Sequence, residues 1–288
     1  MKINIMAAGG QLGRTVVDTF LQCGIDPQDL IASVRTPAKV NDMARKGIDV
    51  RRTDYDDPNT MKYSFRNSDV VILITSTALV EERKKQFDLA IEALEQCQVE
   101  RVIFASFAAA RPDSEFLMAP FYVYAEDKLQ KTNLGWTILR DGMYLDPVAE
   151  WVPSLIKMGR LPYPVKHGQV AYISREDIAR SLVYASVSRR HTGKIYDLTG
   201  VEAVSMSYLA QVISRVTGES IVFETVSESE FAEICRDDGV SEPMIEVLIS
   251  MYRAVDNGEF ELVTDHVEKL TGREPESVGS YIQRMAYF

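Results

Sequence analysis

The chain has 288 residues, 46% of them hydrophobic and 26% charged, which is typical of a globular protein large enough to bury a sizeable core. No stretch reaches the roughly 18 apolar residues that span a membrane, and the N-terminal segment is too short and too polar to predict a signal peptide. The net charge is −10, and nine acids but one base lie between Glu219 and Glu246, which disfavours a nucleic-acid-binding role. The three cysteines and three histidines lack metal-ligand spacing, which predicts reduced thiols, no metal site and a cytoplasmic protein.

In the first half, short apolar runs alternate with segments of helical periodicity. The expected strands cover 2–7, 29–34, 48–53, 69–75, 101–107 and 137–140. The expected helices cover 11–23, 37–46, 58–67, 81–97 and 122–133. Such alternation is typical of βαβ units, and strands that are apolar on both faces are covered by helices on both sides. The pattern predicts an α/β fold with a doubly wound parallel sheet of the Rossmann type.

The second half is mainly helical. Residues 151–164 contain three prolines and predict an irregular segment. Ser174 is a plausible N-cap for a helix to about 187, followed by a strand near 194–199. Further on, one strand is expected at 221–226 and helices at 205–217, 227–237, 242–257, 264–271 and 275–286. We therefore expect a nucleotide-binding core over 1–145, to which the strand near 194–199 returns, and a smaller helical part over 146–288. A cleft between these parts is the default ligand site.

A glycine-rich loop, Ala7 to Gly13, joins the first strand to the first helix. Dinucleotide folds need a tight turn here, close backbone approach to pyrophosphate, and a small residue where the helix packs on the strand. Gly10 and Gly13 suit the last two tasks, and the N–H groups of Gln11 and Leu12 would face phosphate at the helix N-terminus. Glycine loops without ligands also occur, and the position after the first strand is what favours a nucleotide site.

The loop, together with residues 34–39, 52–55 and 138–142, resembles the NmrA-like proteins, an atypical branch of the short-chain dehydrogenase superfamily. The nearest members are quinone oxidoreductases and triphenylmethane-type dye reductases that use NADPH without flavin. The resemblance extends through 241–270 to essentially the whole chain. Its loop usually reads Gly-x-x-Gly-x-x-Gly, and Ala7 stands at the first glycine. A methyl group there disfavours positive φ or displaces the chain, so we expect Ala7 to weaken nucleotide binding.

The nucleotide preference is indicated at the end of the second strand. NAD-specific proteins place an acid there, whereas Arg35 and Lys39 can face a 2′-phosphate. Both could instead be solvated surface cations. We expect NADP(H) as cofactor, with NAD(H) as the alternative. The resemblance implies that Asp54, next to Tyr55, contacts adenine, although Asp54 could equally be a turn residue.

Tyr124 and Lys128 form the Tyr-x-x-x-Lys motif of the chain, on the helix where the superfamily keeps its catalytic pair. At i, i+4 they share one helix face, and the ammonium would lower the pKa of the phenol. The Lys would also hold the nicotinamide ribose. Many NmrA-like members lack the Tyr, so Tyr124 could simply pack as an aromatic, and we expect activity to depend more on Lys128.

Several strand ends supply further candidates. The resemblance implies that Ser106 orients substrate, although a small residue at a strand end is the other reading. Thr75 and Ser76 end the fourth strand at the edge where cofactors bind. Asp141 and Tyr144 follow the sixth strand. The family often has Asn at 141, and a negative charge beside nicotinamide would stabilise the oxidised ring.

Three functions remain open. The first is a reductase that passes hydride from NADPH to a quinone or another planar, conjugated molecule in an apolar pocket. Candidate lining residues are Tyr144, Trp151, Tyr163, Met244 and Tyr252. The second is a redox sensor with little catalysis, which Ala7 and Asp141 favour. The third is a non-redox isomerase or lyase. We expect a small-molecule substrate, no nucleic-acid or membrane partner, and a homodimer as one possible assembly.

Overall fold

The structure is a computed structural model and describes residues 1–285. The chain forms two compact units. The first contains residues 1–106, 121–140 and 175–196, and the second contains residues 107–120, 141–174 and 197–288. Each unit is described by itself.

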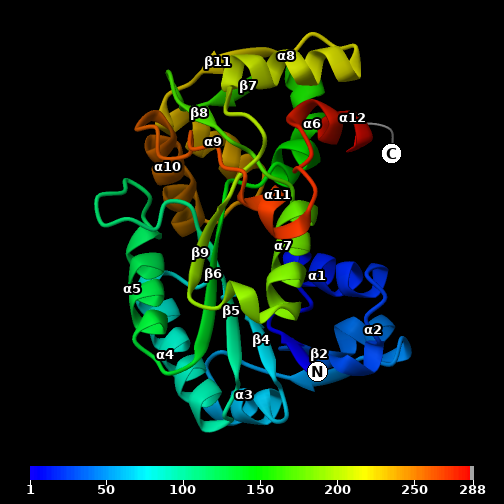
Figure 1. Cartoon of the computed structure of the whole chain (residues 1–288). Helices are drawn as coiled ribbons and strands as arrows, with labels where there is room; N and C mark the ends of the chain where they lie inside the picture. The colour runs from blue at the N-terminus through cyan, green and yellow to red at the C-terminus, as the bar shows by residue number, and fades with distance from the viewer. Residues whose placement is uncertain (286–288) are drawn as a thin grey trace. The chain divides into compact units, whose positions relative to one another are not determined.

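A seven-stranded sheet organises the first unit and confirms the predicted Rossmann-type fold (Figure 1). Its strand order is β3 (Asp49–Arg52), β2 (Leu30–Val34), β1 (Ile3–Ile5), β4 (Val70–Leu73), β5 (Arg101–Phe107), β6 (Gly135–Asp141) and β9 (Lys194–Leu198). From β3 to β5 the pairs are parallel, with Ile3 opposite both Leu30 and Val70. The order reverses beside β1, which is the switch point where doubly wound sheets bind ligands. The strand expected to return to the core is β9, at the edge beside β6.

Helices cover both faces of this sheet (Figure 1). They are α1 (Gln11–Gln22), α2 (Asn41–Arg45), α3 (Pro58–Phe65), α4 (Val80–Gln96), α5 (Ala119–Gln130) and α7 (Arg175–Val187). Helix α1 packs on α7, and α3 packs on α4. Between α4, α5 and the sheet, the ring of Phe87 lies 5.2 Å from that of Phe104 and 5.9 Å from that of Phe121. The single helix expected over 37–46 is instead a 3-10 turn, Pro37–Val40, followed by the short α2.

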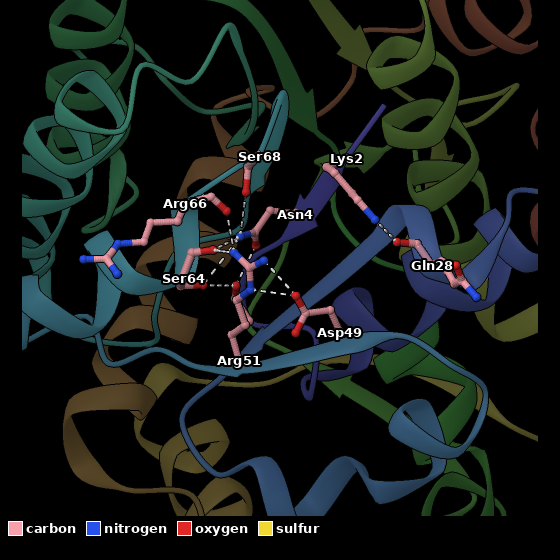
Figure 2. A network of polar contacts seen from close by, with 9 residues as sticks. Lys2, Asn4, Gln28, Asp49, Arg51, Ser64, Arg66 and Ser68 are labelled. Atoms are coloured by element: carbon pink, nitrogen blue, oxygen red, sulfur yellow. Dashed lines mark hydrogen bonds and ion pairs between the residues drawn. The ribbon is translucent and has the colours of Figure 1, made fainter.

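A buried polar network ties α3 to the first three strands (Figure 2). The Asn4 amide, fully buried in β1, donates to the Ser64 carbonyl at 2.8 Å and accepts from the Ser33 hydroxyl at 2.6 Å. Arg51 donates to the carbonyls of Ser64 and Arg66 at 2.7 and 2.6 Å. Because buried polar groups are costly unless they are paired, this network fixes α3 beneath β1 and β2.

The second unit is largely helical. Its helices are α6 (Asp146–Met158), α8 (Met206–Thr217), α9 (Glu228–Asp237), α10 (Glu242–Asp256), α11 (His266–Thr271) and α12 (Val278–Met285). Short strand pairs join β7 (Arg160–Tyr163) to β11 (Val222–Thr225) and β8 (Gln169–Val170) to β10 (Val204–Ser205). The helices expected from 205 onward are confirmed, except that the last position expected for the final helix, 286, lies outside the described residues.

The prediction of an irregular segment over 151–164 was wrong, because α6 and β7 occupy these residues. Val148, Val152 and Leu155 are buried at helical spacing, whereas Pro153 lies on the exposed side of the helix. The apolar face outweighs the hydrogen bond that a proline removes from a helix interior. The helix ends at Gly159, whose φ of 67° suits a left-handed C-cap.

Candidate functional site

The glycine loop leaves several backbone N–H groups open at the start of α1. Ala8 N–H donates to the Ser33 carbonyl at 3.1 Å, and Gly10 N–H donates to the Ala7 carbonyl at 2.9 Å. Arg14 N–H makes the first helical bond, to the Gly10 carbonyl. Within residues 1–285, the N–H groups of Gln11, Leu12 and Gly13 have no acceptor. Open N–H groups at a helix N-terminus are suited to anions, and binding of phosphate by these three groups stays a prediction.

Gly13 lies where no side chain fits. A Cβ at Gly13 would lie 2.3 Å from the Ala7 carbonyl oxygen and 2.7 Å from the Ala8 Cα, both backbone atoms. A Cβ at Gly10 would lie 3.3 Å from the same oxygen, a much milder contact. Gly13 is therefore the glycine that lets α1 pack on the loop.

Ala7 has a positive φ of 51°, the left-handed conformation that favours glycine. The turn thus takes the geometry of a glycine although it carries a methyl group. A left-handed residue other than glycine costs roughly 1–2 kcal/mol. Ala7 therefore strains the loop without preventing its fold.

Ala7→Gly is expected to raise the free energy of unfolding by up to about 1 kcal/mol. Glycine removes the left-handed strain, and this gain exceeds the cost of the greater conformational entropy that glycine gives the unfolded chain. Nucleotide should bind more tightly by a similar amount if the methyl obstructs the turn. Urea denaturation and fluorescence titration with NADPH measure the two effects. Weaker binding in the variant would show that the methyl group does not hinder the loop.

Two cations flank the loop. Arg35 and Lys39 are exposed, and within residues 1–285 neither side chain has a hydrogen bond or ion pair. Gly9 lies beside Val34, since a Cβ there would meet the Val34 side chain at 3.5 Å, so the loop lies next to the end of β2. Arg14, which sequence reasoning missed, pairs with Asp42 at 3.1 Å and donates to the Lys39 carbonyl at 2.9 Å. A basic residue in the first turn after the glycine loop was the signal for it.

Asp54 takes the turn role that the sequence left open. Its carboxylate accepts from Asp56 N–H at 3.2 Å, and its own N–H donates to the Thr60 hydroxyl at 2.9 Å. These contacts stabilise the turn before α3. Contact with adenine stays a prediction.

Tyr55, Thr75 and Ser76 are brought together around a cavity of about 10 Å³ at the end of β4. The Tyr55 hydroxyl donates to the Ile74 carbonyl, and burial raises the pKa of this phenol well above its usual value. The Ser76 hydroxyl bonds the Gln86 side chain. A cavity of this size holds at most a water molecule, so these contacts shape the strand end.

Tyr124 and Lys128 do share one helix face, and both contact Asp88 of α4. The Tyr124 hydroxyl donates to the Asp88 carboxylate at 2.6 Å, and the Lys128 ammonium lies 2.6 Å from the same oxygen. The expected lowering of the tyrosine pKa was wrong, because its hydrogen bond to Asp88 and its burial raise the pKa of Tyr124. Burial lowers the pKa of Lys128, but the bond to Asp88 outweighs it and raises the pKa. Asp88 thus neutralises the charge that was to activate the phenol.

Ser106 is buried and bonded to a carboxylate. Its hydroxyl donates to Glu126 at 2.6 Å, and Arg140 makes a bidentate pair with the same carboxylate, with its shortest contact 2.7 Å long. Glu126 is 5% exposed. Sequence reasoning missed this trio, which joins α5 to β5 and β6, and the Ser106 hydroxyl has a structural partner here.

Asp141 ends β6 and is 1% exposed. Its Oδ2 accepts from the Tyr144 hydroxyl at 3.0 Å, whereas its Oδ1 has no partner within residues 1–285. Burial raises the pKa of Asp141 to about 8, against the opposing effect of the Tyr144 bond. The expectation of a negative charge here at neutral pH was wrong, because the buried carboxyl is mainly protonated below pH 8.

An aromatic cavity of about 490 Å³ lies within the second unit. It is lined by Phe107, Met143, Tyr144, Pro147, Val148, Glu150, Trp151, Tyr163, Tyr172, Phe231, Ile234, Cys235, Asp238, Val240, Leu248, Met251 and Tyr252. Four of the five expected lining residues are among them. Met244 is not, although it shares a face of α10 with Leu248 and Met251, because it lies one turn nearer the start of that helix. The volume suits a small planar ligand.

The cavity walls combine stacked rings with acidic groups. Tyr163 lies 5.6 Å from Trp151, 4.7 Å from Tyr252 and 6.2 Å from Phe231, between ring centres. The charged groups in its wall are the carboxylates of Glu150 and Asp238, and no basic residue lines it within residues 1–285. Such a wall favours neutral or cationic aromatic ligands over anionic ones.

Comparison with known proteins places the chain in a family. The sequence profile of the NmrA-like family matches residues 1–282. The chain belongs to this family. It is 26% identical to quinone oxidoreductase 2 of Escherichia coli K12 over 246 residues, which cover 85% of each chain.

Solved structures share the fold over the whole chain. A Staphylococcus aureus structure described as a nucleoside-diphosphate-sugar epimerase is 30% identical, with a TM-score of 0.92 and coverage of 98% of this chain and 100% of that one. The Citrobacter sp. triphenylmethane reductase complexed with NADP(H) is 24% identical, with a TM-score of 0.92 and coverage of 99% and 100%.

Neither a metal centre nor a membrane-spanning helix accompanies these features in residues 1–285. Among residues 1–285, no cluster of three or more His, Cys, Asp or Glu side chains is placed to bind a metal ion. None of the helices formed by these residues has the length and apolar character to cross a membrane. The NmrA-like chain thus carries a glycine loop with open N–H groups and flanking cations in its first unit, and an aromatic cavity in its second.

Proposed function

We propose that this protein is an NADPH-dependent reductase that passes hydride to a neutral or cationic planar acceptor, such as a quinone or a conjugated dye. The observation that carries the proposal is the aromatic cavity, whose wall includes Phe107 at the end of β5 and Met143 and Tyr144 just after β6. Ligands of doubly wound sheets bind at these carboxyl ends. When bound, the cofactor supplies the hydride from its nicotinamide ring.

The residues of the glycine loop fit such a cofactor. The open N–H groups of Gln11, Leu12 and Gly13 would hold the pyrophosphate. The unpaired cations Arg35 and Lys39 would face a 2′-phosphate, which NADPH has and NADH lacks. The NADP(H) complex of the triphenylmethane reductase and the activity named for quinone oxidoreductase 2 support the same assignment.

The remaining predicted site residues enter the proposal in supporting roles. Lys128 and Tyr124 are held by Asp88, and Ser106 is held by Glu126. We therefore assign Lys128 and Tyr124 to holding α5 against α4, and Ser106 to holding α5 against β5. Binding of adenine near Asp54, a cytoplasmic location and a homodimer remain predictions from the sequence.

Two alternative functions are each favoured by one observation. The strain at Ala7 favours a sensor that binds nucleotide without turnover. The epimerase description of the S. aureus structure favours non-redox chemistry on a sugar nucleotide. Such a substrate carries a diphosphate, and the cavity wall has carboxylates rather than cations within residues 1–285. The reductase accounts better for an aromatic, acidic cavity.

Arg35→Ala is expected to weaken NADPH binding by roughly 1.5–3 kcal/mol, the range for a hydrogen bond to a charged group, and to leave NADH binding nearly the same. Calorimetric titration of both nucleotides gives the two values. Arg45→Ala is the matched control, because Arg45 is also exposed and lies in α2, just beyond Lys39. It should change the ratio of the two affinities by less than about twofold. Equal losses for both nucleotides in Arg35→Ala would refute the 2′-phosphate assignment.

A further inference from the structure

A buried acid stands directly behind one tyrosine of the cavity wall. Asp141 is 1% exposed, and its Oδ1 has no hydrogen-bond partner within residues 1–285. Its Oδ2 lies 3.0 Å from the hydroxyl of Tyr144, which lines the cavity. An unpaired polar atom in the interior is costly, and such atoms in native proteins often have a functional reason.

The surroundings of Asp141 keep its carboxyl neutral. The Ala108 N–H donates to its backbone carbonyl, not to its side chain. The next residue, Gly142, donates its N–H to the Leu198 carbonyl, and a Cβ added at this glycine would lie 3.3 Å from a methyl group of Ile173. Burial raises the pKa of Asp141 to about 8, and Tyr144 is the titratable group that opposes the rise. At neutral pH the carboxyl therefore holds a proton that it can give up.

The other titratable groups in the cavity wall do not offer this chemistry. Burial raises the pKa of Tyr163 to about 12 and that of Tyr172 and Tyr252 well above the usual value. Burial likewise raises the pKa of the Cys235 thiol. Glu150 and Asp238 are the remaining acids of the wall. Asp141 is distinguished from them by its direct bond to a wall tyrosine.

We propose that Tyr144 donates the proton that accompanies hydride transfer to a carbonyl-type acceptor, and that Asp141 resupplies Tyr144. The inference rests on the proposed reductase function. Tyr144 is the catalytic residue in this proposal, because it lines the cavity that would hold the acceptor, and Asp141 acts through its bond to the Tyr144 hydroxyl.

The atoms and electrons balance for a quinone. Hydride from NADPH brings two electrons and leaves NADP⁺ and a hydroquinone anion. The Tyr144 O–H bond breaks as an O–H bond forms on the anion. The Asp141 O–H bond then breaks and the tyrosine O–H bond re-forms. The Asp141 carboxylate finally takes a proton from water, so that one NADPH and one proton reduce one quinone.

A cationic triarylmethane dye provides the internal comparison. Hydride adds to its cationic carbon and yields a neutral product, so no proton is needed. Tyr144→Phe and Asp141→Asn should therefore lower kcat for a quinone by about 100-fold, within the range for general acid catalysis. The same variants should lower the rate with the dye by a factor that is at least about 10 times smaller than the factor for the quinone. Tyr172→Phe is the matched control in the same wall and should change both rates by a similar factor.

The pH profile and an infrared measurement complete the test. Wild-type kcat with the quinone should fall as pH rises through about 8, the pKa of Asp141, and this break should vanish in Asp141→Asn. The infrared difference between wild type and Asp141→Asn, without nucleotide, should show a protonated-carboxyl band at pH 7 that disappears near the same pH. Equal losses with both acceptors, or no such band, would overturn the proton-donor role. A wild type that reduces neither acceptor would instead refute the reductase function itself.

Discussion

Gly13→Ala is expected to abolish measurable nucleotide binding and to lower the free energy of unfolding by about 1–3 kcal/mol, the usual effect of overpacking. The new methyl group would lie 2.3 Å from the Ala7 carbonyl oxygen and 2.7 Å from the Ala8 Cα. Backbone atoms cannot rotate away as a side chain can. Helix α1 must therefore move, and its open N–H groups move with it.

Gly9→Ala is the matched control for this loss. A Cβ at Gly9 would meet the side chains of Val34 and Val40 at 3.5 Å, which is ordinary van der Waals contact. Its stability should stay within about 0.5 kcal/mol of wild type, as for most tolerated substitutions. Urea denaturation and NADPH titration of both variants separate the effects. If Gly13→Ala bound NADPH like wild type, the loop would not bind the pyrophosphate as proposed.

Asp141→Asn is expected to raise the free energy of unfolding above that of wild type at pH 8. This gain should be up to about 5 kcal/mol larger at pH 8 than at pH 4. The folded carboxyl has its pKa raised from 3.8 to about 8, a difference of about four units. As pH rises above 4, the unfolded chain ionises this group while the folded chain keeps it neutral. The Asp141 carboxyl therefore does not lower the stability of the folded wild type below pH 4. As pH rises from 4 to 8, it lowers that stability progressively.

Asp177→Asn provides the contrast for this measurement. The Asp177 carboxylate is also buried, but it forms an ion pair with Arg180 at 2.7 Å. Removing one partner of a buried pair typically destabilises by about 3–5 kcal/mol, so its effect should have the opposite sign. Urea denaturation at pH 4 and pH 8 measures both variants. An Asp141→Asn variant with the same pH dependence as wild type would show that Asp141 is ionised in the folded state.

The strands and the glycine loop could be predicted because they depend on local patterns. Fully buried strands need continuous apolar runs, as in β4, and the loop needs Gly13 at its closest backbone approach. The segment around Pro153 was misjudged for the opposite reason. Its helix forms because Val148 and Val152 are buried on one face, whereas a proline in the sequence reveals only the lost hydrogen bond.

The roles of the polar candidates could not be predicted, because they depend on partners far along the chain. The motif spacing placed Tyr124 and Lys128 together, but Asp88, which reverses the expected pKa change, lies 36 residues before Tyr124. Asp141 was identified as a departure from its family, yet its charge state depends on burial that no sequence pattern reports. Local periodicity reveals which face of a helix is apolar, but not which turns of that face line a cavity, as Met244 illustrates.

Transfer of deuterium from NADPH labelled at the hydride position to a cationic triarylmethane dye tests the reductase proposal most directly. The label would form a carbon–deuterium bond in the reduced dye, which mass spectrometry detects and water cannot exchange. The reductase account predicts one deuterium in each reduced dye molecule for each NADPH oxidised. Binding of NADPH without dye reduction, or reduced dye that carries no label, would contradict direct hydride transfer and favour the sensor.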